Sequence, residues 1–190
     1  MRNRWQVQVK AAARQRPISV QMALTVAGAV SLALLSQVSI PLQPVPVTLQ
    51  VLGVLLLGCT LGPWFGAMAV VEYLLLGLLG APVFSGAGSG PAFLFGPHGG
   101  YLLAFPLAAG VSGLLYQHCN SDGRFWRVLS ACGAGFTGVA VIYLGGWAWL
   151  TGPYHLGALP ALAVGVTPFI LLDFVKAIVV ALTMSSRGKE

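Results

Sequence analysis

The segment Phe169-Ile-Leu-Leu-Asp-Phe-Val-Lys-Ala-Ile-Val-Val180 is almost wholly apolar, yet it contains two charged residues, Asp173 and Lys176. It lies within a longer apolar run, from about Pro160 to Met184, that can cross a lipid bilayer. A charge at the bilayer centre costs about 2.5–3.5 kcal/mol on insertion scales, so membrane helices rarely keep one without a use. Residues three positions apart share one helix face. The segment therefore predicts a membrane helix with a functional polar site formed by Asp173 and Lys176.

The composition of the whole chain supports a membrane protein. Its 190 residues are 57% hydrophobic and 7% charged, with a mean hydropathy of +0.84. Soluble domains contain about 25% charged residues. The net charge of +6 does not gather into a soluble basic patch, so we expect no nucleic-acid partner. At about 20 residues per helix, the length allows one domain with about six spans.

We expect an all-α bundle of six transmembrane helices, separated by turns. The approximate spans are 20–40, 47–61, 65–79, 101–117, 128–150 and 160–184. Prolines between 41 and 46 and Gly62-Pro63-Trp64 mark the first two turns, because proline does not fit a helix interior. In the last span, Pro168 either begins a helix after Thr167 or, with Gly165, kinks a longer discontinuous helix.

The basic residues predict the orientation. Of ten lysines and arginines, five precede the first span, two lie between spans four and five, and two follow span six. Loops on the other side, at 41–46, 80–100 and 151–159, contain none. The positive-inside rule then places both termini in the cytoplasm. The membrane domain is 18–186, flanked by a basic cytoplasmic segment, 1–17, and a cytoplasmic tail, 187–190.

The loop at 80–100 is rich in glycine and proline, and we expect it to lack helix and to cover the bundle. About twenty residues without helical pattern inside a compact protein usually form a functional loop. The loop contains Phe84, Phe93 and Phe95, so it is not a solvated linker. Irregular backbone at membrane depth must face protein or water. Asp173 and Lys176 would lie beneath this loop, in the outer half of the last span.

Two interpretations apply to the Asp173–Lys176 pair: a structural ion pair or a site for a polar ligand. Replacing a buried pair by apolar residues is often neutral or stabilising, so stability alone is a weak reason to keep one. A carboxylate accepts from ligand N–H groups and an ammonium donates to a carbonyl or an anion, which favours the ligand site. Further candidates for this pocket are Gln50, Tyr73 and Phe84.

Glu72 is a third charged residue in an apolar run, near the middle of span three. It is either a second pocket acid, a proton site, or a group that reaches a polar cavity. If Glu72 and Asp173 formed an acid–base pair, the protein would be an intramembrane enzyme, and this is the alternative we consider to a binding protein.

We expect no metal or cofactor. The cysteines and histidines have no metal-ligand spacing, and the glycines at 86–90 lack the strand and the following lysine of a phosphate loop.

Several fragments, in this order, closely resemble the BioY family. They are Pro44-Val-Pro46-Val-Thr48-Leu-Gln50, Tyr73-Leu-Leu-Leu-Gly77-Leu-Leu-Gly80-Ala-Pro82-Val-Phe84, Gly96-Pro97-His98-Gly99-Gly100-Tyr101, and Asp173-Phe-Val-Lys176. The family comprises substrate-binding S components of energy-coupling factor (ECF) transporters, specific for biotin. The resemblance spans about residues 40–182. It implies a six-helix S-component fold in a prokaryotic cell membrane, with a biotin pocket near the outer surface.

The resemblance also implies that Asp173 and Lys176 bind biotin directly. Our hypothesis is that Asp173 accepts from a ureido N–H and that Lys176 contacts a ligand oxygen, either ureido or carboxylate. Two departures matter: His98 replaces an expected threonine, and Ser85–Gly90 lacks the basic residue of some relatives. Lys176 is then the one intramembrane cation available to a carboxylate. If it fills that role, Lys176→Ala should weaken biotin more than biotinamide.

The implied partners are a transmembrane coupling subunit and two cytoplasmic ATPases. Small residues of span one, such as Ala23 and Ala27, either pack within the chain or dock that subunit. Transport by this protein alone or as an oligomer is a further alternative.

Overall fold

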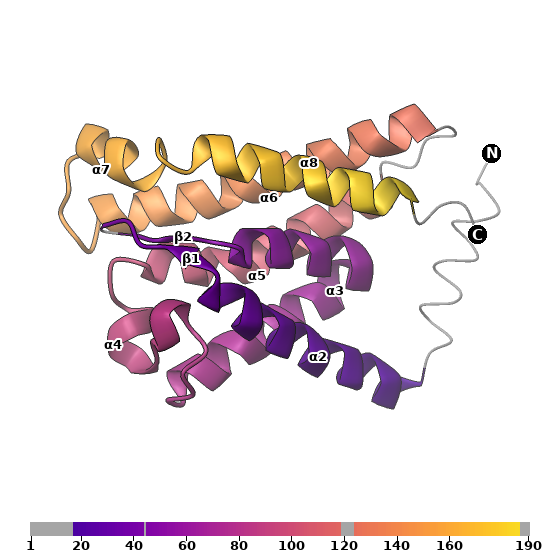
Figure 1. The fold of residues 1–190 in the computed structure, drawn as a ribbon, viewed down its shortest axis with the longest axis horizontal. Helices are drawn as coiled ribbons and strands as arrows, with labels where there is room; N and C mark the ends of the chain where they lie inside the picture. The colour runs from indigo at the N-terminus through magenta and orange to yellow at the C-terminus, as the bar shows by residue number, and fades with distance from the viewer. Residues whose placement is uncertain (1–16, 44, 119–123, 187–190) are drawn as a thin grey trace.

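The computed structural model describes residues 17–43, 45–118 and 124–186, and within them the fold is helical (Figure 1). The helices are α2 (Ile18–Gln37), α3 (Gln50–Leu78), α4 (Gly90–Leu94), α5 (Gly99–His118), α6 (Arg124–Thr151), α7 (Ala158–Gly165) and α8 (Ile170–Ser186), with the 3-10 turn η1 (Ser85–Ala87). Strands β1 (Ser39–Ile40) and β2 (Val47–Thr48) form a two-residue antiparallel ribbon. Apart from Pro17, the predicted segments 1–17 and 187–190 lie outside the described residues.

Four of the described helices are long and apolar enough to cross a membrane. They are α2, α3, α5 and the 128–151 part of α6, and the count becomes five if α7 and α8 form one bent span. Large apolar side chains such as Leu79, Leu107 and Leu171 are exposed on the outside of the bundle. Such side chains suit a lipid environment, so the protein is a multi-pass membrane protein.

Helix α3 consists of two limbs that meet at Gly62. Gly62 has φ +84° and ψ 176°, a conformation essentially restricted to glycine, and Pro63 follows it. A Cβ atom built on Gly66 would lie 2.8 Å from the Cα of Gly58. That close approach requires the chain to turn back on itself at Gly62. The two limbs correspond to the separate spans predicted at 47–61 and 65–79.

The last apolar run is broken, as the discontinuous-helix alternative predicted. Helices α7 and α8 are bent by 55° at a break between Gly165 and Ile170. Pro168 lies in this break, where its missing N–H removes no helical hydrogen bond. Asp173 consequently falls in the first turn of α8, where the positive end of the helix dipole stabilises a carboxylate.

The prediction that 80–100 lacks helix was wrong, because this loop contains η1 and the single turn of α4. Phe84 is fully buried, and the indole N–H of Trp149 donates to the carbonyl of Gly96 at 3.0 Å. The loop is therefore packed onto the bundle. Figure 1 shows α4, the β1–β2 ribbon and α7 at one end, while α2 begins and α8 ends toward the opposite end.

Replacing Gly62 by alanine tests the reversal in α3. Alanine at this φ and ψ is strained by about 1–3 kcal/mol, so thermal unfolding of the detergent-solubilised protein should occur at lower temperature. Gly133→Ala in α6 is the control, because a Cβ atom there meets nothing within 4 Å and the glycine needs no positive φ. Equal unfolding temperatures for both variants would contradict this description of α3.

Candidate ligand-binding site

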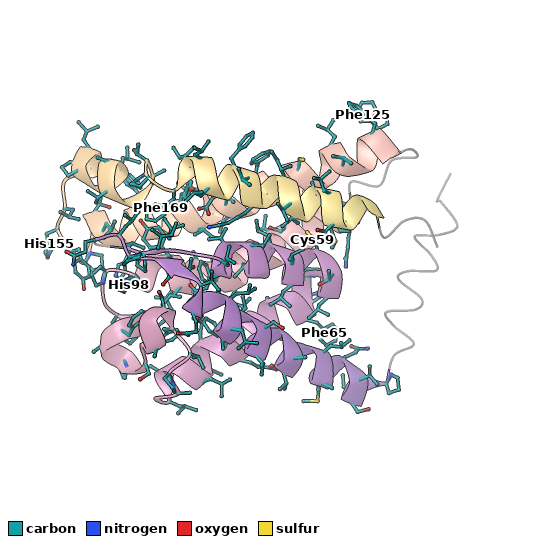
Figure 2. The ribbon with its side chains drawn as sticks, in the orientation of Figure 1. Cys59, Phe65, His98, Phe125, His155 and Phe169 are labelled. Carbon is teal, nitrogen blue, oxygen red and sulfur yellow. The ribbon has the colours of Figure 1, made fainter. Side chains whose placement is uncertain are left out.

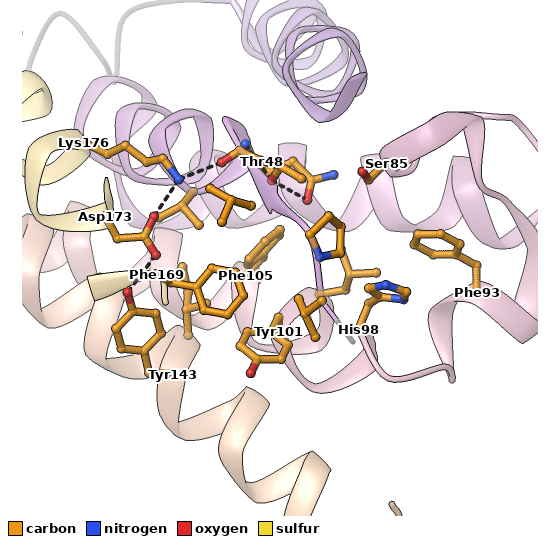
Figure 3. A pocket seen from close by; sticks show the side chains of 17 residues that line it. Thr48, Ser85, Phe93, His98, Tyr101, Phe105, Tyr143, Phe169, Asp173 and Lys176 are labelled. Atoms are coloured by element: carbon orange, nitrogen blue, oxygen red, sulfur yellow. Dashed lines mark hydrogen bonds and ion pairs between the residues drawn. The ribbon is translucent and has the colours of Figure 1, made fainter. Parts of the chain in front are cut away.

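A cavity lies at the end of the bundle that carries α4, α7 and the β ribbon (Figure 3). It contains about 550 Å³ of empty space when its open mouth is included. Its lining is Val45, Pro46, Val47, Thr48, Gln50, Val51, Ser85, Phe93, His98, Tyr101, Leu102, Phe105, Ile142, Tyr143, Phe169, Asp173 and Lys176. Figure 2 shows His98 and Phe169 at this end, and Phe125 near the other.

Asp173 and Lys176 form the charged part of the lining. The Lys176 ammonium lies 2.6 Å from Asp173 Oδ1, and both side chains are less than a tenth exposed. Lys176 Nζ also donates to the backbone carbonyl of Thr48 at 2.7 Å. The hydroxyl of Tyr143 donates to Asp173 Oδ2 at 2.9 Å. Each group keeps capacity for a ligand, because the ammonium has a third proton and the carboxylate has further lone pairs.

Gln50 belongs to a second polar group in the wall. Its backbone N–H donates to Thr48 Oγ1 at 3.2 Å, and its amide Nε2 donates to the Tyr73 hydroxyl at 2.6 Å. Tyr73 in turn donates to the carbonyl of Val83 at 3.2 Å. These bonds fix the Gln50 amide at the first turn of α3, on the cavity surface. They also connect that wall to the 80–100 loop.

Tyr73 and Phe84, predicted as pocket residues, are fully buried and do not belong to the cavity lining. They stand one layer behind it. The Phe84 ring packs edge-on against Tyr73 at 5.5 Å and stacks on Phe93 at 5.1 Å, and Phe93 stacks on His98 at 4.7 Å. Of these four rings, Phe93 and His98 reach the cavity. The stack thus gives the loop a rigid inner face.

The structure separates Glu72 from the cavity. Its Oε1 atom lies 2.8 Å from the hydroxyl of Thr25 in α2, and the residue is absent from the cavity lining. Asp173 contacts Lys176 and Tyr143 instead. The acid–base pair required by the enzyme alternative is therefore not assembled.

Sequence reasoning missed Tyr143 and Thr48. Tyr143 lies in an apolar helix, where one tyrosine resembles the packing residues around it, and the Thr48 acceptor is a backbone carbonyl that every residue has. Tyr143 lies on another helix, thirty residues before Asp173, so no local sequence pattern relates the two residues.

An integral membrane helix bundle with a partly polar cavity under a folded loop defines a membrane-embedded binding protein for a small molecule. A family model described as the BioY family matches residues 5–189, and the chain belongs to that family. These findings confirm the resemblance that the motifs indicated.

Individual relatives support this assignment. A "Probable biotin transporter BioY" from Pyrococcus horikoshii is 41% identical over 160 residues, covering 84% of this chain and 86% of its own. The "Biotin transporter BioY" of Thermotoga maritima is 41% identical over 145 residues, covering 76% and 82%. A crystal structure described as the S-component for biotin from an ECF-type ABC transporter matches with a TM-score of 0.78 at 27% identity, covering 90% of this chain and 92% of that one.

His98 makes the folded loop sensitive to pH. Its Nδ1 atom is buried without a hydrogen-bond partner, and burial lowers the pKa of its imidazole below the ordinary value of 6.5. The unfolded chain therefore binds a proton more readily than the folded protein, so stability present above pH 6.5 is lost as the pH falls below it.

Thermal unfolding between pH 7.5 and 5 measures this effect. His98→Gln should flatten the decrease at low pH, whereas a substitution of the exposed His118 should keep it. An unchanged pH dependence in His98→Gln would contradict the role assigned to His98.

Proposed function

We propose that this protein binds biotin from the outer side of the membrane and is the substrate-binding subunit of a transporter. The observation that carries the proposal is the Asp173–Lys176 pair, buried at one end of a cavity whose lining is mostly apolar. Two relatives that are 41% identical to this chain are named biotin transporters, and the matching crystal structure is described as an S-component for biotin. The names of these relatives favour a function in transport rather than in catalysis.

Biotin suits the cavity chemically. Its ureido group has two N–H donors and one carbonyl acceptor, and Asp173 has lone pairs to accept from an N–H group. The aromatic side chains of Tyr101, Phe105 and Phe169 offer an apolar wall for the sulfur-containing ring and the aliphatic chain. Gln50 can supply a further amide contact. In this arrangement Tyr73 and Phe84 act indirectly, by holding Gln50 and the loop.

We infer that Lys176 donates to the ureido oxygen rather than to the carboxylate. Its charge is already balanced by Asp173 at 2.6 Å. A ligand carboxylate beside the pair would place two anions against one cation in a buried site, which is costly. A neutral carbonyl adds no charge and uses the remaining ammonium proton. The carboxylate would then extend toward the part of the cavity lined by Ser85 and His98.

Titration of the purified protein with biotin tests the function. The wild type should bind unmodified biotin without forming a product, and Asp173→Asn should weaken the affinity by about 30-fold or more. The reason is that breaking a buried charge pair costs about 2–5 kcal/mol, since the other charge loses its partner. Leu171→Ala, on the exposed face of α8, is the matched control and should bind as the wild type does. Unchanged affinity in Asp173→Asn would reject this site.

A second titration distinguishes the two ligand oxygens. If Lys176 contacts the ureido oxygen, Lys176→Ala should weaken biotin and biotinamide by factors that agree within about threefold. Both constants are measured on the same folded variant, whose thermal unfolding is checked first. An additional loss of about tenfold or more for biotin alone would instead assign Lys176 to the carboxylate.

We propose six membrane segments: α2, the two limbs of α3, α5, α6, and the broken α7–α8 unit. Both termini would lie in the cytoplasm and the cavity in the outer half. The basic residues at 2–16, 124–127 and 187–189 support this orientation. Helix α2 begins and helix α8 ends toward the same end of the bundle, which also supports this orientation (Figure 1).

We propose that the partners are an ECF coupling subunit and two ATP-binding subunits. Ala23, Ala27 and Ser31 are spaced by four residues and exposed on α2, so they could admit a second helix closely, whereas Gly28 and Ala29 pack inside the chain. Biotin uptake by vesicles that contain this protein without partners would instead support transport by the protein alone or as an oligomer.

A further inference from the structure

The last residue of α2, Gln37, contacts the loop that covers the cavity. Its amide Nε2 atom donates to the carbonyl of Phe84 at 3.0 Å, and its Oε1 atom accepts from the backbone N–H of Ala87 at 3.1 Å. These two bonds meet the 80–100 loop on either side of Ser85, which lines the cavity (Figure 3). Gln37 itself is not part of the lining. A side chain outside the cavity therefore holds one part of its wall in place.

The amide group suits this contact. A primary amide has donors and an acceptor in one planar group, so it can pair with a backbone carbonyl and a backbone N–H at once. The neighbouring Ser36 hydroxyl, which is fully buried, donates to the carbonyl of Val83 at 2.5 Å. Gln37 is exposed at the edge of the same contact. Its bonds can therefore break without opening the packed interior beneath them.

The turn that Gln37 binds has an unusual backbone. Ala87 has φ +56°, in the left-handed region, and Gly86 before it has φ +65°. The bond from the Phe84 N–H to the Gly88 carbonyl, at 3.0 Å, closes this turn. An alanine in the left-handed region is strained by its Cβ atom, whereas a glycine is not. Strain of this kind persists where the surroundings hold the residue, and the bond from the Ala87 N–H to Gln37 is such a hold.

Packed rings on both sides confine movement to residues 85–90. Before them, the ring of Phe84 is fully buried. After them, Phe93 stacks on the Phe84 ring at 5.1 Å. Between these anchors, Gly90 has φ +80°, and no described atom lies within 4 Å of a Cβ built on it. Residues 85–90 can therefore move while both anchors stay in place, and Gln37 ties them to α2.

We propose that Gln37 is a latch: its bonds keep residues 85–90 closed over the cavity and so set the rates at which a ligand enters and leaves. The latch rests on the ligand-binding function proposed above. Because both bonds lie outside the cavity, they hold the closed loop equally whether or not a ligand is bound. An interaction that does not differ between these two states does not change the affinity. Loss of the latch should therefore speed entry and exit together and leave the dissociation constant in place.

Rapid-mixing measurements of biotin association and dissociation test the latch. Gln37→Met keeps the length of the side chain and removes both bonds, so each rate constant should rise about fivefold or more. The dissociation constant, which is the ratio of the two, should change by less than about twofold. Leu34→Met, about one turn earlier and exposed on the same helix, is the matched control and should keep both wild-type rates. Unchanged rates in Gln37→Met, or a weaker affinity caused by faster dissociation alone, would overturn the proposal.

A rescue variant separates the latch from a general loss of structure. Adding Ala87→Gly to Gln37→Met should return both rates toward the wild-type values, since glycine adopts the positive φ without the help of Gln37. Rates that stay fast in the double variant would contradict the role assigned to the strained turn.

Amide hydrogen exchange of the purified protein tests the same contact without biotin. A peptide that contains residues 85–90 should exchange about fivefold or more faster in Gln37→Met than in the wild type, and at the wild-type rate in Leu34→Met. Equal exchange in Gln37→Met and the wild type would overturn the latch. If the wild type failed to bind biotin, the proposed function would be rejected, while the exchange measurement would still decide whether Gln37 holds the loop.

Discussion

The bond between Lys176 and the backbone carbonyl of Thr48 joins segments 128 residues apart in the chain. It ties the first turns of α8 to the end of the β ribbon, just before α3 begins. With Asp173 on the same helix and Tyr143 on α6, the ammonium becomes the centre of a polar cluster that draws three parts of the bundle together. The cavity exists where these parts meet. A buried charge needs such partners, and their placement determines which walls the site has.

The folded loop depends on a second set of contacts that meets the first at Thr48 and Gln50. Gln50 binds Tyr73, Tyr73 binds the Val83 carbonyl, and Phe84 packs against Tyr73. From Phe84 the ring stack continues through Phe93 to His98 at the cavity. A change at either end of this sequence of contacts therefore reaches the ligand site. The loop is a packed part of the bundle, and its motion would have to break several hydrogen bonds and ring contacts.

The sequence predicted those features that depend on residue type and local spacing. A charge in an apolar run is unusual anywhere in a chain, so Asp173, Lys176 and Glu72 were evident, and Gly62 and Pro168 marked real breaks. It did not predict which way a side chain points across helices. Tyr73 and Phe84 were expected at the pocket but lie behind it, and Tyr143 was not expected at all. The one-turn helix α4 was missed because so short a segment has no periodicity to detect.

We propose that Asp173 and Lys176 hold the ureido group of biotin beside Tyr143, at the junction of α6, α8 and the β ribbon. The most direct measurement is an experimental structure of this protein with biotin bound. We expect a ureido nitrogen within hydrogen-bond distance of Asp173 and the ureido oxygen within hydrogen-bond distance of Lys176 Nζ. Biotin bound outside this cavity, or with its carboxylate at Lys176, would contradict it.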